Sequence, residues 1–303
     1  GSGDLEVSDF ALSISGGSST VATTPTSITK TSQTVWVLGL NVSGTASGSE
    51  TISAVPASTT SIYDIFGNAA STTQSGNTAS LNDKTAPTMA ITASEVSDGD
   101  TSNDGTLSLT FTSSEATSNF GEVDISVSGG TLSSFAITSS TIYTATFTPS
   151  GDGATTIDVA AGAFTDVANN DIAAAAQFNW IYDATAPTMA ITSTEVTDGD
   201  RSNDGTLSLT FTSSKVTTNF VVGDITVSGG DISSFAGSGT TYTATFTPSG
   251  NGATTIDVAA GTFTDVANNN NTAATQFNWI YDSTMPTMAI TSTEVTDGDR
   301  SND

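Results

Sequence analysis

Acidic and amide side chains recur at fixed places in this sequence, and their oxygen atoms are the groups best suited to bind a metal ion. One candidate set consists of Asp83, Glu115, Asp166 and Asn169. Calcium takes six to eight oxygen ligands from carboxylates, amides and backbone carbonyls. These residue types therefore predict a calcium site, provided that the fold brings the four positions together.

A second copy of the same set occurs about 100 residues further along the chain, with one change. Asp183, Asp265 and Asn268 are retained, but Lys215 stands where Glu115 stands in the first copy. Because a cation replaces one carboxylate, the sequence predicts a weaker metal site there, or none.

Asp98 and Asp100 form another acidic group, repeated as Asp198 and Asp200. The run Asp-Gly-Asp-x-x-Asn-Asp is loosely similar to the start of an EF-hand calcium loop, but the distal bidentate Glu is missing. The alternative interpretation is that Asp, Asn and Gly build a tight solvated turn. The stretch 166–170 has a similar alternative, since Asx side chains accept hydrogen bonds from backbone amides two residues on. Both interpretations remain open on the sequence alone.

The sequence contains little that supports other kinds of chemistry. The chain has no Cys and no His, which excludes disulfides, thiolate–zinc sites and imidazole catalysis from this sequence. No pair of carboxylates stands out for glycoside hydrolysis, so we expect no enzymatic activity. Asn41 and Asn270 lie in N-glycosylation sequons, which matter only in a eukaryotic source.

The charge balance restricts the partners. Five Lys and Arg residues face 31 Asp and Glu residues, giving a formal net charge of −26. Phosphate backbones and anionic lipids would repel such a chain, so we expect no nucleic-acid partner. No apolar run is long enough to span a membrane, and we expect no membrane insertion within this sequence.

Internal repeats determine how these residues are positioned. The hexapeptide at 87–92 recurs at 187–192 and at 286–291, and residues 104–114 recur unchanged at 204–214. The repeats predict four segments: a partial, diverged module at 1–82, modules at 83–182 and 183–281, and the start of a further module at 282–303. Both ends fall inside a module, so we expect the function to belong to a longer molecule.

Each copy alternates apolar and polar residues with a period of two, which is typical of half-buried strands. Leu107, Leu109 and Phe111 share one face, as do Phe178, Trp180 and Tyr182. Turn clusters rich in Gly, Ser and Asp separate about seven such strands per copy. The pattern predicts an all-β fold of tandem Ig-like β-sandwich modules, with Trp180 and Trp279 in the core rather than on a sugar-binding surface.

Strand alternation also sorts the loops by end. Loops 113–119 and 161–173 should lie beside the incoming linker 83–87, while loops 97–104, 128–130 and 150–153 lie at the opposite end. Asp83, Glu115, Asp166 and Asn169 should therefore converge at one end of the first complete module.

The order and spacing of several motifs resemble the bacterial Ig-like repeat families of large surface adhesins. The motifs are Asp83–Thr88, Ser114-Glu115, Asp124-Ile125 and Asp166–Asn170. The resemblance covers essentially the whole chain and implies an extracellular stalk or extender role at a cell surface. The possible metal site also resembles the interdomain calcium sites of cadherins and calcium-stiffened adhesins.

Two functions remain open. The first is a structural rod, stalk or filament shaft, whose partners are the neighbouring modules of the same chain and other copies in a fibre. The second is an adhesin whose modules bind glycans or a partner surface. A spacer should lack a surface patch common to all modules, whereas a binder should carry one.

Overall fold

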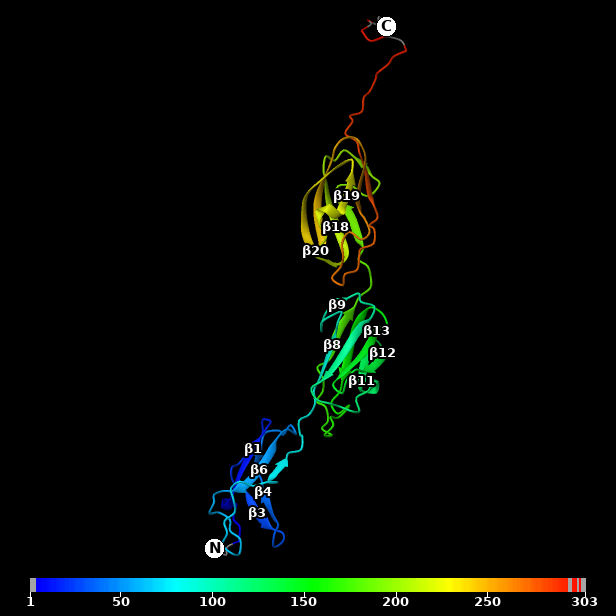
Figure 1. The fold of residues 1–303 in the computed structure, drawn as a ribbon. Coiled ribbons are helices and arrows are strands. Elements are labelled where there is room, and N and C mark those ends of the chain that lie inside the picture. The colour runs from blue at the N-terminus through cyan, green and yellow to red at the C-terminus, as the bar shows by residue number, and fades with distance from the viewer. Residues whose placement is uncertain (1–3, 294–295, 299, 301–303) are drawn as a thin grey trace. The chain divides into compact units, whose positions relative to one another are not determined.

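The computed structural model describes residues 4–293, 296–298 and 300 of the chain. Strands dominate these residues, and the helical elements among them are three short 3₁₀ turns, η1 (Val7–Asp9), η2 (Glu122–Asp124) and η3 (Val222–Asp224) (Figure 1). The all-β fold class predicted from the alternating pattern is confirmed. No helix in the described ranges is long and apolar enough to cross a membrane.

The chain divides into two compact units, which are described one at a time. The first contains Gly1–Gly99, Thr106–Ser150 and Thr155–Trp180, and the second contains Asp100–Gly105, Gly151–Ala154 and Ile181–Asp303.

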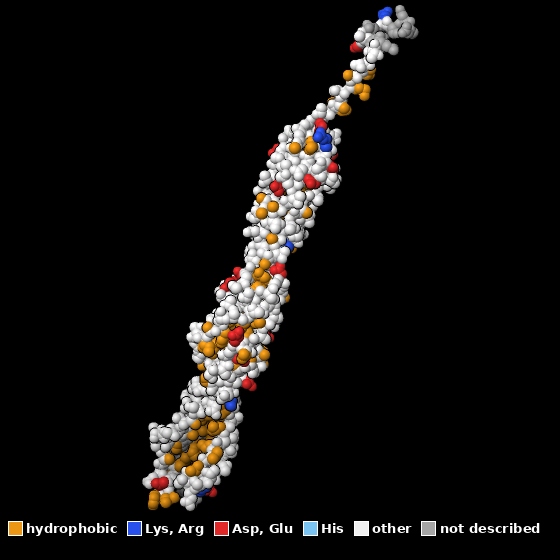
Figure 2. Space-filling model, turned by 90° about the vertical axis from the view of Figure 1, so that its right-hand side faces the viewer, with side chains coloured by type: hydrophobic (Ala, Val, Ile, Leu, Met, Phe, Trp, Pro, Cys, Tyr) orange, Lys and Arg blue, Asp and Glu red, His pale blue; other side chains and the backbone are white. Residues whose placement is uncertain are grey.

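The N-terminal part of the first unit contains one small sheet and two strand pairs. The sheet has the order β1-β6-β7, and the pairs are β2-β5 and β3-β4. The bounds are β1 (Phe10–Ser15), β2 (Thr20–Val21), β3 (Ser27–Lys30), β4 (Trp36–Gly39), β5 (Val42–Ser43), β6 (Thr51–Pro56) and β7 (Thr78–Ser80). Leu12 and Ile52 are buried, but Val35, Val37 and Leu40 remain largely exposed. Figure 2 shows apolar side chains gathered on this part of the chain.

Residues 83–182 form two four-stranded sheets packed face to face. One sheet has the order β12-β13-β10-β8 and the other β11-β14-β15-β9. The bounds are β8 (Met89–Ala93), β9 (Thr101–Ser102), β10 (Leu107–Ser113), β11 (Ile125–Ser128), β12 (Gly130–Ile137), β13 (Ile142–Pro149), β14 (Gly153–Val159) and β15 (Phe178–Tyr182). The eighth strand, beyond the seven expected, is the two-residue β9, which pairs in parallel with β15.

The core of this repeat lies between the two sheets and follows the alternation in the sequence. Leu107, Leu109 and Phe111 are at most 1% exposed, and the residues between them are not buried. Trp180 is 1% exposed, so its predicted core position is confirmed, as is that of Trp279. Phe120 reaches over from the loop after β10 and packs on Tyr143 with ring centroids 4.8 Å apart.

Residues 183–281 repeat this arrangement in the second unit. The sheets have the orders β16-β18-β20 and β17-β22-β21-β19. The bounds are β16 (Met189–Ser193), β17 (Arg201–Ser202), β18 (Leu207–Thr217), β19 (Ile225–Ser228), β20 (Gly230–Pro248), β21 (Gly252–Val258) and β22 (Phe277–Tyr281). The long β20 covers the place of both β12 and β13, and the repeat is one residue shorter where β12 and β13 are joined by an exposed turn.

The described residues after β22 form no strand, although residues 286–291 have the sequence that begins β16 in the previous copy. Met285, Met288 and Ile290 are more than 80% exposed. In the second repeat, the equivalent strand β16 pairs with β18.

Candidate metal centre

Three chain segments meet at one end of the first repeat. They are the linker before β8, the loop that follows β10 and the loop between β14 and β15. Backbone hydrogen bonds join them: the Ser114 amide donates to the Thr88 carbonyl at 2.9 Å, and the Ala173 amide to the Pro87 carbonyl at 3.1 Å. A third bond, from the Val167 amide to the Ala116 carbonyl at 3.2 Å, joins the two loops. The sorting of these loops by strand direction agrees with the structure.

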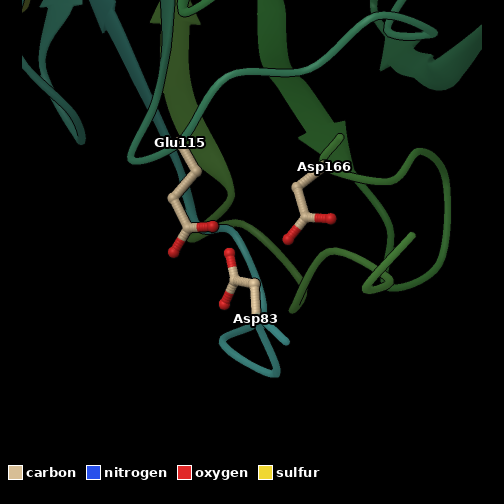
Figure 3. A group of neighbouring side chains, drawn as sticks. All are labelled: Asp83, Glu115 and Asp166. Carbon is tan, nitrogen blue, oxygen red and sulfur yellow. The ribbon is translucent and has the colours of Figure 1, made fainter. Parts of the chain in front are cut away.

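Each of the three segments contributes one carboxylate to a cluster. Oxygen atoms of Asp83, Glu115 and Asp166 all lie within 4.8 Å of one another, and Figure 3 shows the three side chains pointing toward a common centre. Asp166 is buried, while the other two are half-buried. Within the described residues, this is the one group of three or more acidic, His or Cys side chains spaced to hold a metal ion.

The cluster holds excess negative charge. Burial, followed by the charges of Asp83 and Asp166, raises the pKa of Glu115 above its usual value. A carboxyl group whose ionised form is disfavoured by like charges takes up either a proton or a cation. The arrangement therefore favours the protonated form of Glu115 over the fully ionised cluster.

Asp166 is fixed by its own loop. Its Oδ1 accepts hydrogen bonds from the amides of Ala168 at 2.7 Å and Asn170 at 2.9 Å, and its Oδ2 accepts one from Asn170 Nδ2 at 2.9 Å. Burial opposes ionisation of Asp166, but the Asn170 and Ala168 hydrogen bonds outweigh it and lower the pKa. These contacts are the Asx turn that the sequence offered as an alternative, and they hold a charged carboxylate in the cluster.

The amide partner of Asp166 differs from the one expected. Asn169 is exposed and has a backbone φ of 65°, and Asn268 has a φ of 67°. Asn tolerates this left-handed conformation better than most residues, so its place here is explained by the turn. The next residue, Asn170, is the one whose side chain contacts Asp166. The sequence pointed to this partner only through the two adjacent Asn residues at positions 169 and 170, either of which could contact Asp166.

In the second repeat a lysine lies between the equivalent carboxylates. Lys215 Nζ contacts Asp183 Oδ1 and the Thr185 carbonyl, and lies 3.3 Å from Asp265 Oδ2. The Asp265 side chain has no exposed surface, and those of Lys215 and Asp183 are about one quarter exposed. Burial lowers the pKa of Lys215, but Asp183 and Asp265 outweigh it and raise that pKa above its usual value.

Asp98 and Asp100 lie in the loop between β8 and β9, and no acidic cluster forms around them in the described part of the chain. Asp98 Oδ1 accepts the Asn179 amide at 2.6 Å, and Asp198 does the same with Asn278 at 2.6 Å. This hydrogen bond joins the loop to strand β15 or β22. The structure thus shows the Asp98 carboxylate attaching its loop to the neighbouring strand.

The two sequon residues, Asn41 and Asn270, are both exposed. Glycosylation of either residue stays a prediction.

Comparison with protein families assigns the two complete repeats to a known family. A family model described as a bacterial Ig-like domain matches residues 83–181 and again residues 183–281, more than half of the chain. The chain belongs to the bacterial Ig-like domain family. This confirms the resemblance inferred from the motifs in the linker and loops. A comparison with curated proteins found no match.

Solved structures similar to this chain include three bacterial proteins. The adhesin FdeC of Escherichia coli is 19% identical, with 89% of this chain and 85% of that chain covered and a TM-score of 0.37. Invasin, a bacterial integrin-binding protein, is 15% identical over 84% of this chain and 50% of its own, with a TM-score of 0.35. InvD of Yersinia pseudotuberculosis is 18% identical over 66% and 60%, with a TM-score of 0.33.

Proposed function

We propose that this chain is part of an extracellular adhesin-type surface protein, in which serial Ig-like modules form a stalk that carries other parts of the molecule away from the cell. The observation that supports this most directly is the consecutive match of two repeats to the bacterial Ig-like family. Such a repeat contributes length, and the same module can be added many times without new contacts having to evolve.

Each repeat contains a complete core of its own, which a load-bearing series requires. In the second repeat, Leu207, Phe246 and Trp279 are at most 1% exposed and belong to one buried cluster. A domain of about 100 residues with its own two-sheet core is large enough to fold alone. Every module added to the series would then be stable without its neighbours.

The segment that leads into each repeat is held by that repeat. The Thr272 amide donates to the Pro187 carbonyl at 3.0 Å, and Asn269 Nδ2 donates to the Asp183 carbonyl at 2.8 Å. Pro187 restricts the backbone further, because its ring fixes φ. These contacts support a linker of limited flexibility, as a stalk needs.

The cavities of the repeats favour a spacer over a binder of small ligands. Each repeat has a shallow cavity at the same place, about 250 Å³ beside Phe178 and about 220 Å³ beside Phe277. Sites for small molecules are usually about 300–1,000 Å³ and bring several polar groups together. Asp98 or Asp198 is the acidic residue at each cavity, and its carboxylate already accepts a backbone hydrogen bond.

Electron microscopy of proteins containing two, four and eight copies of residues 83–281 tests the stalk. We expect extended particles whose length grows in proportion to the number of copies. Compact particles of constant length would contradict the proposal. A glycan array probed with the same proteins separates the alternative, since selective retention of glycans by the repeats would identify them as binding modules.

A further inference from the structure

The N-terminal part of the chain has an open apolar groove between strand β4 and the sheet β1-β6-β7. The apolar residues that line this N-terminal groove are Leu12, Leu38, Leu40, Ile52, Ala54 and Ala79. Its volume is about 210 Å³, and Figure 2 shows apolar side chains lining a hollow on this part of the chain. An apolar cavity of about 150 Å³ already holds a benzene molecule. The groove therefore has room for apolar side chains from another segment.

The first complete repeat shows which element fills the equivalent place. The turn η1, the sheet β1-β6-β7 and the pair β3-β4 have the same order and pairing as η2, the strands β11-β14-β15 and the pair β12-β13. Strand β13 pairs with β12 on one side and with β10 on the other. Among the described residues, β4 pairs with β3 alone. The N-terminal groove thus lies where β10 packs in a complete repeat.

Strand β10 also shows what kind of segment this place accepts. Its inward residues Leu107, Leu109 and Phe111 are at most 1% exposed, and the residues between them are not buried. In the N-terminal part, by contrast, Leu40 is 42% exposed. An extended segment with apolar residues at alternate positions would pair with the free edge of β4 and cover the groove at the same time.

The chain itself contains an unpaired segment of this kind. Residues 286–291 form no strand, and their alternate apolar residues Met288 and Ile290 are about 90% exposed, at 89% and 92%. In the second repeat, the equivalent Met189 belongs to the buried core cluster, and Ile191 packs against that cluster. The same side chains therefore fit the core of a module in this chain when their segment is paired.

We propose that residues 286–291 of one copy of this chain add a strand to β4 of a second copy, with Met288 and Ile290 in the N-terminal groove. Side chains two positions apart lie on the same face of a strand, so both enter the groove together. Pro286 cannot donate a backbone hydrogen bond, but it lies at the start of the added strand, where proline is tolerated. This contact between copies goes beyond the proposed stalk and does not depend on it.

Charge does not oppose the contact locally. Two copies with a formal net charge of −26 each repel one another at long range. However, residues 283–293 contain no charged side chain, and none lines the N-terminal groove. No ionised group therefore has to lose its water when the segment docks.

The proposed contact joins two different surfaces, so it is heterologous. A copy that accepts a strand in its groove still has its own segment to donate to the next copy. Heterologous contacts that do not close into a ring give open chains, and we expect linear chains here. One added strand buries less surface than a standard protein interface, so we expect micromolar rather than nanomolar affinity.

Sedimentation velocity of the 303-residue protein at increasing concentrations tests the proposal. We expect the average mass to rise with concentration and to rise further with added salt, because salt screens the repulsion between acidic copies. The double variant Met288→Asp with Ile290→Asp should stay monomeric. The matched control, Thr287→Asp with Ala289→Asp, adds the same charge to the opposite face of the same segment and should associate like the unaltered protein.

Mixing two variants gives a second test. Leu40→Asp changes the groove at a position that is already partly exposed and leaves the segment intact, so it should also be monomeric. Near-ultraviolet circular dichroism checks that this variant is folded. An equal mixture of Leu40→Asp with the Met288→Asp and Ile290→Asp double variant should form dimers and nothing larger, since one intact groove and one intact segment remain.

Three results would overturn the proposal. The first is an unaltered protein that is monomeric at every concentration, whether its groove stays open or is covered by its own chain. The second is association that persists in the Met288→Asp and Ile290→Asp double variant, or is lost equally in the matched control. The third is a mixture of the two monomeric variants that forms no dimer.

Discussion

Glu50 and Glu115 have the same side chain, but their surroundings shift its pKa in opposite directions. Glu50 has no exposed surface, yet its Oε2 accepts hydrogen bonds from the Ser47 amide at 2.9 Å and the Ser47 hydroxyl at 3.2 Å. Burial opposes its ionisation, but the amide hydrogen bonds from Ser47 and Ser19 outweigh it and lower the pKa to about 2. Glu115 faces two carboxylates instead, and its pKa is raised.

Glu50→Gln should therefore destabilise the N-terminal part of the chain at neutral pH. Because the folded-state pKa is below the unfolded value of 4.5, the contribution of Glu50 is complete above pH 4.5 and is lost as the pH falls toward about 2. Urea unfolding of both proteins between pH 7 and pH 2 measures this. A difference in stability that stayed constant over that range would contradict the account.

Glu115→Gln should have the opposite effect when no divalent ion is present. Since the folded state binds the Glu115 proton more tightly than the unfolded state does, this residue reduces stability as the pH rises from 4.5 through its raised pKa. The variant should be the more stable protein at pH 7, and the two should become equal in acid. Melting curves in chelator from pH 4 to pH 8 test this, and an unaltered protein at least as stable as the variant at pH 7 would contradict it.

The sequence predicted which carboxylates meet but not how each is held. Strand direction alone was enough to bring Asp83, Glu115 and Asp166 to the same end of the repeat. The choice between Asn169 and Asn170 depends on a left-handed turn, whose position the sequence does not determine. The contacts of Lys215 could not be predicted from the sequence either, because a lysine in place of a glutamate indicates only that a carboxylate is lost.

At the level of the strands, close packing restricts single positions that the alternating pattern does not identify. Gly130 begins β12, and a Cβ atom there would lie 2.4 Å from Phe147 Cζ and 2.5 Å from the Thr148 carbonyl oxygen. Gly230 has the same contacts with Phe246 and Thr247 in the second repeat. A glycine is needed at this position because the adjacent strand approaches too closely for any side chain.

Gly130→Ala should lower the free energy of unfolding of the first repeat by about 1–3 kcal/mol, the usual cost of overpacking. Gly121→Ala is the matched control, since its Cβ would meet nothing within 4 Å and its φ of −145° suits any residue. The control should change the stability by no more than about 0.5 kcal/mol. Equal destabilisation by both substitutions in denaturant titrations would show that the close approach is not responsible.

The strands that alternate most regularly were predicted well, and the exceptions have physical reasons. The parallel strand β9 has only two residues, too few to show a period. Residues 286–291 repeat a sequence that in the second repeat leads into β16, which is paired with β18, yet they form no strand in the described part of the chain. Local sequence therefore predicts that a segment can form a strand, and its partner determines whether it does.

At the level of the whole molecule, we expect the two matched repeats to fold one at a time. Each of the two matched repeats has two sheets and a buried aromatic core, and each begins with a linker that is hydrogen-bonded to its own loops. The modules should therefore resist force singly and refold singly. They differ at the linker, where the second repeat has Lys215 in contact with Asp183 and the first repeat has Glu115 at the equivalent position.

Single-molecule stretching of a protein with several copies of residues 83–281 tests this central claim most directly. We predict a series of separate unfolding events, each lengthening the chain by roughly 300 Å, because one repeat of about 100 residues extends by up to about 3.3–3.6 Å per residue less its folded length. Unfolding of all copies in one cooperative event, or extension without resolved events, would contradict the account.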